Sequence, residues 1–378
     1  MMTRPRILVA DKIAQEGLDV LAQAGEVLVK TGQSEDELVG LVADVQAIVV
    51  RSATKITARV IEAAEQLKII ARAGVGVDNI DVDAATRLGV LVVNSPAGNT
   101  LAAAEFTMAM LLAAARNVPQ AYLAMRSGSW DRSKFTGRQL FGKTLGIVGF
   151  GRIGREVASR AKAMGMRLLV FDPFVADERI EAEGAVPADL PVLLAESDFV
   201  TLHAQLTPQT EGMIGADELK SMKPTALLIN CARGALVQEE ALVQALQEGW
   251  IAGAALDVFR DDKHPSPELL AMDQVVVTPH LGASAEEAQV QVAVDVAEQV
   301  VDVLEGRPAR SPVNAPALPP EQREELAEYI ALAQALGKLA AATADAAVGT
   351  LALSAGEEVS DEHLSLLARH AVADYLHT

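Results

Sequence analysis

Three carboxylates and a histidine fall within nine residues in the stretch DVFRDDKHP at 257–265. Asp257, Asp261, Asp262 and His264 could hold a metal ion, take part in proton transfer, or form a solvated polar loop. Their spacing matches no recognised set of metal ligands, so we expect no metal site here. The chemistry of the stretch therefore depends on the elements that flank it.

Those flanking elements follow a repeated strand–helix pattern. Short apolar runs that predict buried strands alternate with amphipathic helical segments: RILVA, EVLV, AIVV, LKIIA and VLVV come first, and TLGIVG, MRLLVF, DFVTLH, ALLIN, IAGAALD and QVVVT follow a long helical stretch near residue 100. This alternation predicts an α/β fold with doubly wound parallel sheets. The Pro-rich stretch 306–320 indicates a linker, and the helix-rich, acidic residues beyond it indicate a separate piece.

Composition excludes several classes of protein. The formal net charge of −19 argues against nucleic acid as a partner, and no apolar run is long enough to span a membrane. The single Cys231 rules out an intrachain disulfide and fits a reducing cytoplasm, and the N-terminus lacks the long apolar region of a signal peptide. We expect a soluble, acidic, cytoplasmic protein with more than one domain.

A glycine pattern after one predicted strand indicates a dinucleotide site. Gly149, Gly151 and Gly154 form GxGxxG between a strand and a helix, and Asp172 ends the next strand. The glycines allow a tight turn, approach of a pyrophosphate and close helix–strand packing, and the aspartate can accept from a ribose 2′-hydroxyl. This predicts NAD rather than NADP, the alternative being a glycine-rich turn that binds nothing.

Two further residues follow predicted strands where ligands bind in such sheets. Arg233 follows ALLIN and His280 follows QVVVT. An arginine there can bind a carboxylate through two hydrogen bonds, and a histidine can exchange a proton with a hydroxyl or keto oxygen. Read singly, they could be a surface ion-pair partner and a structural histidine. Together they suggest hydride transfer at a carbon next to a carboxylate.

Seven stretches resemble the D-2-hydroxyacid dehydrogenases over about residues 5–315. They are VRSATKIT, ARAGVGVDNID, NSPAGNTLAAAEFTMAMLLAAAR, GKTLGIVGFGRIGREVA, INCARGALV, GAALDVF and TPHLGASAEEAQ. The resemblance implies that Arg233 binds the substrate carboxylate and that His280 is the proton donor and acceptor. An acidic residue, usually glutamate, pairs with that histidine in the family, and the spacing assigns this place to Asp262. The shorter aspartate raises the question of whether it reaches His280.

The resemblance also implies the residues that surround the ligands. Besides the three glycines and Asp172, those near the cofactor would be Arg152, Ile153, His203, Cys231, Ala232, Asp257 and Gly282. Those near the substrate would be Arg51, Arg72, Gly74, Val75, Asn99 and Arg132. Arg51 and Arg72 would bind the phosphate side, and Arg132 would reach in from a second subunit. The alternative for these arginines is that they form ordinary surface ion pairs. Cys231 beside Arg233 could suggest a nucleophile, but hydride transfer needs none, and we expect a small buried thiol instead.

The family architecture implies two parallel-sheet lobes and a homodimer or larger homo-oligomer. Residues 1–98 with 284–315 would form the substrate lobe, 99–283 the Rossmann NAD domain, and 316–378 the start of an intermediate regulatory domain, too short for inhibition by serine. The expected reaction is NAD-dependent oxidation of D-3-phosphoglycerate to 3-phosphohydroxypyruvate. The alternatives are a glyoxylate or hydroxypyruvate reductase and an NAD-sensing binding protein of the same fold.

Overall fold

The computed structural model describes residues 4–315 and scattered positions between 329 and 368. Contacts divide the chain into two compact units. One contains the described residues of Met1–Asn99 and Glu286–Thr378, and the other is Thr100–Ala285. The predicted C-terminal piece, 316–378, lies outside the described residues apart from those scattered positions.

The first unit is built on a five-stranded parallel sheet with the order β2-β1-β3-β4-β5. Its strands are β1 (Arg6–Val9), β2 (Glu26–Val29), β3 (Ala47–Val50), β4 (Ile69–Arg72) and β5 (Leu91–Asn94). All five were predicted as buried strands, which is wrong for β2. Both of its terminal residues are exposed, because it forms the edge of the sheet.

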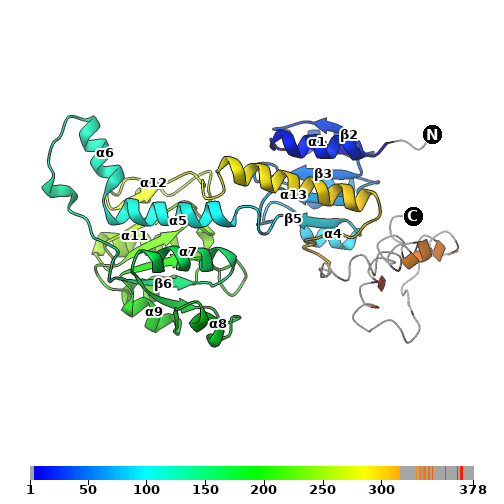
Figure 1. Ribbon diagram of the computed structural model, residues 1–378. Coiled ribbons are helices and arrows are strands. Elements are labelled where there is room, and N and C mark those ends of the chain that lie inside the picture. The colour runs from blue at the N-terminus through cyan, green and yellow to red at the C-terminus, as the bar shows by residue number, and fades with distance from the viewer. Residues whose placement is uncertain are drawn as a thin grey trace. The chain divides into compact units, whose positions relative to one another are not determined.

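Helices cover both faces of this sheet, as Figure 1 shows. Ile7 and Val9 pack with α1 and α13 on one face, while the alternate residue Leu8 packs with helices on the other. The helices are α1 (Gln15–Ala24), α2 (Glu35–Leu41), α3 (Ala58–Glu62), α4 (Val82–Arg87) and α13 (Glu286–Leu304). Burial on both faces explains why the strands are continuously apolar.

The chain that follows α13 returns to this unit instead of leaving it as a free linker. Pro312 forms an antiparallel bridge with Val93, and the Val313 backbone N–H donates to Val92 O at 2.8 Å. The linker prediction is therefore wrong for residues 306–315. Its remaining part, 316–320, lies outside the described residues.

The second unit is built on a seven-stranded parallel sheet with the order β12-β11-β10-β9-β6-β7-β8. Its strands are β6 (Thr144–Val148), β7 (Arg167–Phe171), β8 (Val186–Pro187), β9 (Phe199–Leu202), β10 (Leu227–Asn230), β11 (Gly253–Leu256) and β12 (Val275–Val277). Six were predicted, and β8 was missed because two residues carry no periodicity. β6, β9, β10 and β11 are buried at every position.

Two apolar clusters fill the two faces of this second sheet. Its helices and 3₁₀ turns are α5 (Thr100–Ala115), α6 (Val118–Arg126), η1 (Ser133–Phe135), α7 (Arg152–Ala163), α8 (Asp177–Ala182), α9 (Leu190–Glu196), α10 (Ala216–Ser221), η2 (Gly234–Leu236), α11 (Glu239–Glu248) and α12 (Pro267–Leu270). Figure 1 shows α6 standing away from the sheet, and it has no buried residue.

A search for membrane-spanning helices covered the described residues. No single helix is both long and apolar enough to cross a bilayer, and the one pair that passes on length and composition, α5 with α6, is bent by 63°.

Candidate active site

Asp262 and His280 contact each other directly in the second unit. The Nδ1 atom of His280 lies 2.5 Å from Oδ2 of Asp262, and Oδ1 of Asp262 accepts the Phe259 backbone N–H at 2.8 Å. The shorter carboxylate therefore reaches the histidine. Asp261 and His264, predicted to face solvent, are exposed and pair with each other at 2.9 Å.

The charge state of Asp262 fixes the roles of the two imidazole nitrogens. Burial opposes its ionisation, but the hydrogen bond with His280, the Phe259 N–H, and the charges of His280 and Arg233 together lower the pKa of Asp262. A carboxylate only accepts hydrogen bonds, so Nδ1 must donate. In the neutral ring, Nε2 is then left as a proton acceptor.

His280 is held in an uncommon backbone conformation by Asp257. Its φ of 56° lies in the left-handed region, which non-glycine residues seldom adopt. The fully buried carboxylate of Asp257 accepts from Thr278 Oγ1 at 2.6 Å and from the backbone N–H groups of Leu281 and Gly282 at 2.7 and 2.8 Å. Asp257 thus shapes the turn that carries the histidine. Thr278 was not singled out from the sequence, although it is the first residue of the TPHLG stretch.

Arg233 begins the turn that follows β10. Its backbone carbonyl accepts from Asn230 Nδ2 at 2.9 Å, and one guanidinium nitrogen donates to Ala232 O at 2.8 Å. Its charge contributes to the lowered pKa of Asp262, so the arginine lies within electrostatic range of the pair. The fold thus brings Arg233, Asp262 and His280 to the carboxyl ends of β10, β11 and β12.

The glycine loop after β6 has the geometry that a dinucleotide requires. Gly149 has a φ of +97°, and a Cβ there would lie 2.6 Å from Ala204 N. A Cβ on Gly154 would lie 2.2 Å from Gly149 O, whereas Gly151 faces open space. Gly151 also caps α7, so its backbone can approach a pyrophosphate at the positive end of that helix.

Asp172 is anchored beside this glycine loop. Its Oδ2 accepts the Phe150 N–H at 2.7 Å and its Oδ1 the Phe174 N–H at 2.9 Å. Each carboxylate oxygen keeps a lone pair that can accept from a ribose hydroxyl. The residues present therefore fit NAD.

Two side chains that directly follow strands β9 and β10, those of His203 and Cys231, are uncharged at neutral pH. Burial lowers the pKa of His203 to about 4, and its Nε2 lies 3.0 Å from Thr201 Oγ1. Burial, and then the charge of Asp257, raise the pKa of Cys231 to about 12. Such a thiol is a poor nucleophile, which favours the buried-thiol interpretation. The other predicted cofactor residues occupy the start of α7 and the turn after β10: Arg152, Ile153 and Ala232.

In the first unit, the loop after β3 is clamped by a buried carboxylate that the sequence reading missed. Asp11 accepts the backbone N–H of Arg51 at 2.7 Å and the Thr54 hydroxyl at 2.6 Å. Asn79 Nδ2 donates to Arg51 O at 2.8 Å. Asp11 lies two residues beyond the end of β1, and that place at the carboxyl end of a strand was the available signal. The Arg51 guanidinium makes no hydrogen bond or ion pair with another described residue, which leaves it able to bind an anion.

The other predicted substrate residues differ in how tightly they are held. Arg72 ends β4, and its guanidinium lies where a Cβ on Gly74 would be, 2.2 Å from Nη1. Val75 O accepts from Asn94 Nδ2. Oδ1 of Asn99 is buried without a hydrogen-bond partner among the described residues. Arg132 is exposed next to η1. Within the described part of the chain, no three His, Cys, Asp or Glu residues are grouped so that they could hold a metal ion.

Comparison of the sequence with known proteins found a family and several similar relatives. Residues 108–282 match the family described as D-isomer specific 2-hydroxyacid dehydrogenase, NAD binding domain. The chain is 53% identical over 337 residues to a D-3-phosphoglycerate dehydrogenase of Synechocystis, covering 89% of this chain and 61% of that relative. It is 46% identical to the protein of the same name from Methanocaldococcus jannaschii, covering 96% of this chain and 70% of the relative.

A solved structure shares the fold. It is a glyoxylate reductase from Paecilomyes thermophila, with a TM-score of 0.76 and 31% sequence identity, covering 85% of this chain and 100% of that one. The two parallel-sheet units agree with the predicted fold class.

Proposed function

Because the chain belongs to the D-isomer-specific 2-hydroxyacid dehydrogenase family, we propose that it oxidises D-3-phosphoglycerate to 3-phosphohydroxypyruvate with NAD, the first step of serine biosynthesis. The observation that carries the proposal is the 2.5 Å contact between Asp262 and the Nδ1 atom of His280, because it leaves Nε2 to take a proton. The names and identities of the relatives support the phosphorylated substrate.

Each residue has a defined task in this reaction. Arg233 binds the substrate carboxylate and holds C2 in place. His280 Nε2 takes the proton of the C2 hydroxyl, and Asp262 stabilises the imidazolium that forms. NAD, when bound, supplies the acceptor for the hydride that leaves C2 as the carbon becomes a keto group. Gly149, Gly151, Gly154 and Asp172 bind that cofactor.

The phosphate end requires cations because the protein is strongly acidic. A formal charge of −19 repels an anionic substrate unless basic groups stand close to it. We assign this task to Arg51, whose backbone is clamped by Asp11 and Asn79, and to Arg72. Gly74, Val75 and Asn99 contact the substrate near its carboxylate in this proposal.

We also propose a cytoplasmic homodimer. Helix α6 has no buried residue, and Val118, Tyr122, Leu123 and Met125 on it are exposed. An exposed apolar patch of this kind fits a protein interface. A second copy of this chain is the proposed occupant, and Arg132, just beyond α6, would serve the partner's substrate site.

The first experiment measures NADH oxidation with 3-phosphohydroxypyruvate, glyoxylate, hydroxypyruvate and 2-oxoglutarate at equal concentration. We expect strong preference for the phosphorylated acid, and Arg51→Ala should raise its KM at least tenfold while changing the KM for glyoxylate much less. Preference for glyoxylate or hydroxypyruvate, as the name of the Paecilomyes protein suggests for that enzyme, would favour the reductase alternative.

A binding protein of the same fold is tested separately. His280→Gln should lower turnover at least a hundredfold and leave NAD affinity nearly unchanged, because the histidine acts on the substrate hydroxyl. Turnover equal to wild type would contradict the assigned role of His280.

A further inference from the structure

The carboxylate that orients His280 stands on a short loop after β11. Asp262 is bound on one side by the imidazole and on the other by the Phe259 N–H, three residues earlier. Its side chain is 40% exposed and that of His280 is 43% exposed, so burial does not lock the pair. The position of the loop backbone therefore decides whether a carboxylate as short as aspartate reaches the imidazole.

Two contacts hold this loop in place, one to the start of α11 and one to the turn that carries Arg233. Glu239, the first residue of α11, accepts the Arg260 backbone N–H through Oε1 at 2.6 Å. Gly234 lies so close that a Cβ there would be 1.9 Å from the Phe259 carbonyl carbon. Both contacts are made to the residue pair Phe259–Arg260, which only Asp261 separates from Asp262. A weaker contact joins the Arg260 side chain to Glu211 at 3.5 Å between exposed groups.

We propose that Glu239 is a positioning residue for proton transfer: its carboxylate holds the Phe259–Asp262 loop where Asp262 can reach His280. The inference rests on the proposed dehydrogenase reaction and adds a residue to it. Glu239 does not touch the reacting groups; it acts through the Arg260 backbone. Gly234 complements it, since only a residue without Cβ lets the Arg233 turn and this loop meet.

The strength of the Glu239 contact supports this role. A short hydrogen bond to an ionised acceptor is about twice as strong as a neutral one. It also constrains the backbone two residues from Asp262, whereas a surface ion pair such as Arg260–Glu211 contributes little. Small misplacements of catalytic groups lower rates strongly. Glu240, the next residue, shares the helix N-terminus, but its side chain makes no hydrogen bond or ion pair with another described residue, and so it separates positioning from a helix-dipole effect.

The test compares Glu239→Ala, Glu239→Gln and the control Glu240→Ala in the full chain, using D-3-phosphoglycerate and NAD. We expect Glu239→Ala to lower kcat about tenfold with KM changed less than about twofold. Glu239→Gln should keep most of the rate, because its amide oxygen can accept from Arg260. Glu240→Ala should match wild type. Adding Asp262→Glu to Glu239→Ala should restore activity several-fold, because the longer carboxylate reaches His280 from a relaxed loop.

Amide hydrogen exchange of the peptide that contains residues 257–264 tests the same contact without turnover. Exchange should be faster in Glu239→Ala than in wild type and unchanged in Glu240→Ala. Equal kcat or equal exchange in Glu239→Ala and Glu240→Ala would overturn the inference, as would a double variant no better than Glu239→Ala. A wild-type protein that oxidises no 2-hydroxy acid would instead refute the proposed function, and the exchange data would still decide whether Glu239 holds the loop.

Discussion

The backbone of His280 has a strained conformation that contacts with neighbouring residues maintain. A left-handed non-glycine backbone costs of the order of 1–3 kcal/mol and persists only where surrounding contacts impose it. Here Asp257 imposes it, since its side chain binds the Leu281 and Gly282 N–H groups and its carbonyl accepts the His280 N–H at 2.8 Å. The turn thus places the imidazole in contact with Asp262 without a bound substrate.

His203 gives a prediction about stability and pH. Its pKa is lowered to about 4 by burial, against about 6.5 in an unfolded chain. Between these values the unfolded chain binds a proton that the folded protein does not, so the free energy of unfolding falls as pH falls from about 6.5 to about 4. From pH 6 to pH 4.5 this residue should account for a loss of about 2 kcal/mol.

The variant His203→Asn removes that proton site and keeps a polar partner for Thr201. Urea unfolding can be followed by tryptophan fluorescence, since Trp130 and Trp250 both lie in the second unit. The variant should lose less stability than wild type between pH 6 and 4.5. If the free energy of unfolding fell equally with pH in both proteins, the pKa of His203 would not be lowered in the folded protein, and the prediction would be wrong.

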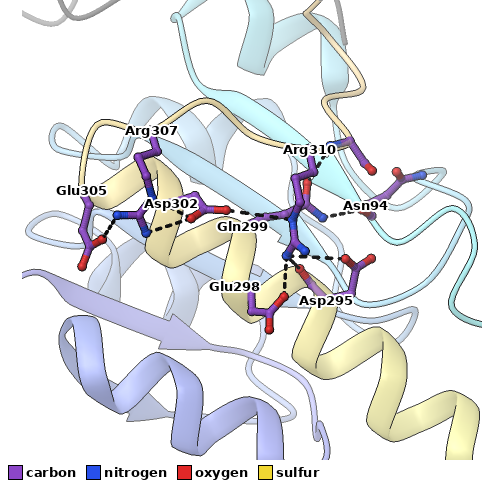
Figure 2. Close-up of polar contacts among 9 residues, drawn as sticks. Asn94, Asp295, Glu298, Gln299, Asp302, Glu305, Arg307 and Arg310 are labelled. Carbon is purple, nitrogen blue, oxygen red and sulfur yellow. Dashed lines mark hydrogen bonds and ion pairs between the residues drawn. The ribbon is translucent and has the colours of Figure 1, made fainter. Parts of the chain in front are cut away.

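At the scale of elements, α13 and the segment that follows it pack against each other and against β5 in the first unit. Figure 2 shows two arginines of this segment against the helix: Arg307 binds Asp302 at 2.9 Å, and Arg310 binds Glu298 at 2.8 Å. In the same view Gln299 joins the helix to β5, because its Nε2 donates to Asn94 O at 3.0 Å. Its Oε1 also accepts the Ser311 N–H at 2.8 Å, which joins the helix to the segment that follows it. Gln299 is fully buried, whereas the ion pairs are partly exposed.

This difference in burial predicts which contacts stabilise the unit. Exposed ion pairs contribute about 0–1 kcal/mol. Gln299→Leu leaves two partly buried backbone groups, Asn94 O and the Ser311 N–H, without this partner. An unpaired buried polar group costs about 1–3 kcal/mol, so the variant should destabilise the first unit by up to roughly 6 kcal/mol. Gln291→Leu, an exposed position on the same helix, is the matched control. Calorimetry should show the first unit melting earlier only in Gln299→Leu, and an equal shift in both variants would contradict the argument.

The sequence predicted the strands of the two sheets better than the contacts between segments that are distant in the chain. Strand runs such as AIVV and ALLIN were recognisable because parallel strands buried on both faces are continuously apolar. Asp262 was found by counting from Asp257, since a motif fixes spacing along the chain. Glu239 and Gly234 were missed, because a contact between segments that are distant in the sequence leaves no local pattern. For the same reason the Pro-rich composition of residues 306–315 predicted a linker, although Pro312 pairs with Val93 of β5.

At the scale of the whole molecule, helix α6 is the element that the fold of one chain leaves unexplained. A helix normally buries one apolar face, yet Tyr122 is 61% and Leu123 is 65% exposed. Trp130, beyond the helix, is 76% exposed. Leaving several large apolar side chains in water is unfavourable by about 25 cal/mol per Å² of apolar surface. A second copy of the chain, with its own α6, would remove this surface from water.

The double variant Tyr122→Asp with Leu123→Asp should therefore separate the dimer. Sedimentation should give twice the chain mass of 39.8 kDa for wild type and 39.8 kDa for the variant. Val192→Asp, at a 46% exposed apolar position on α9, is the control for placing a negative charge on an exposed apolar surface outside α6, and this variant should stay dimeric. Because Arg132 adjoins α6 and is assigned to the partner's substrate site, the monomeric variant should also show a raised KM for the phosphorylated substrate. A wild-type chain that sediments at 39.8 kDa, or a variant that stays dimeric, would show that α6 is not the interface.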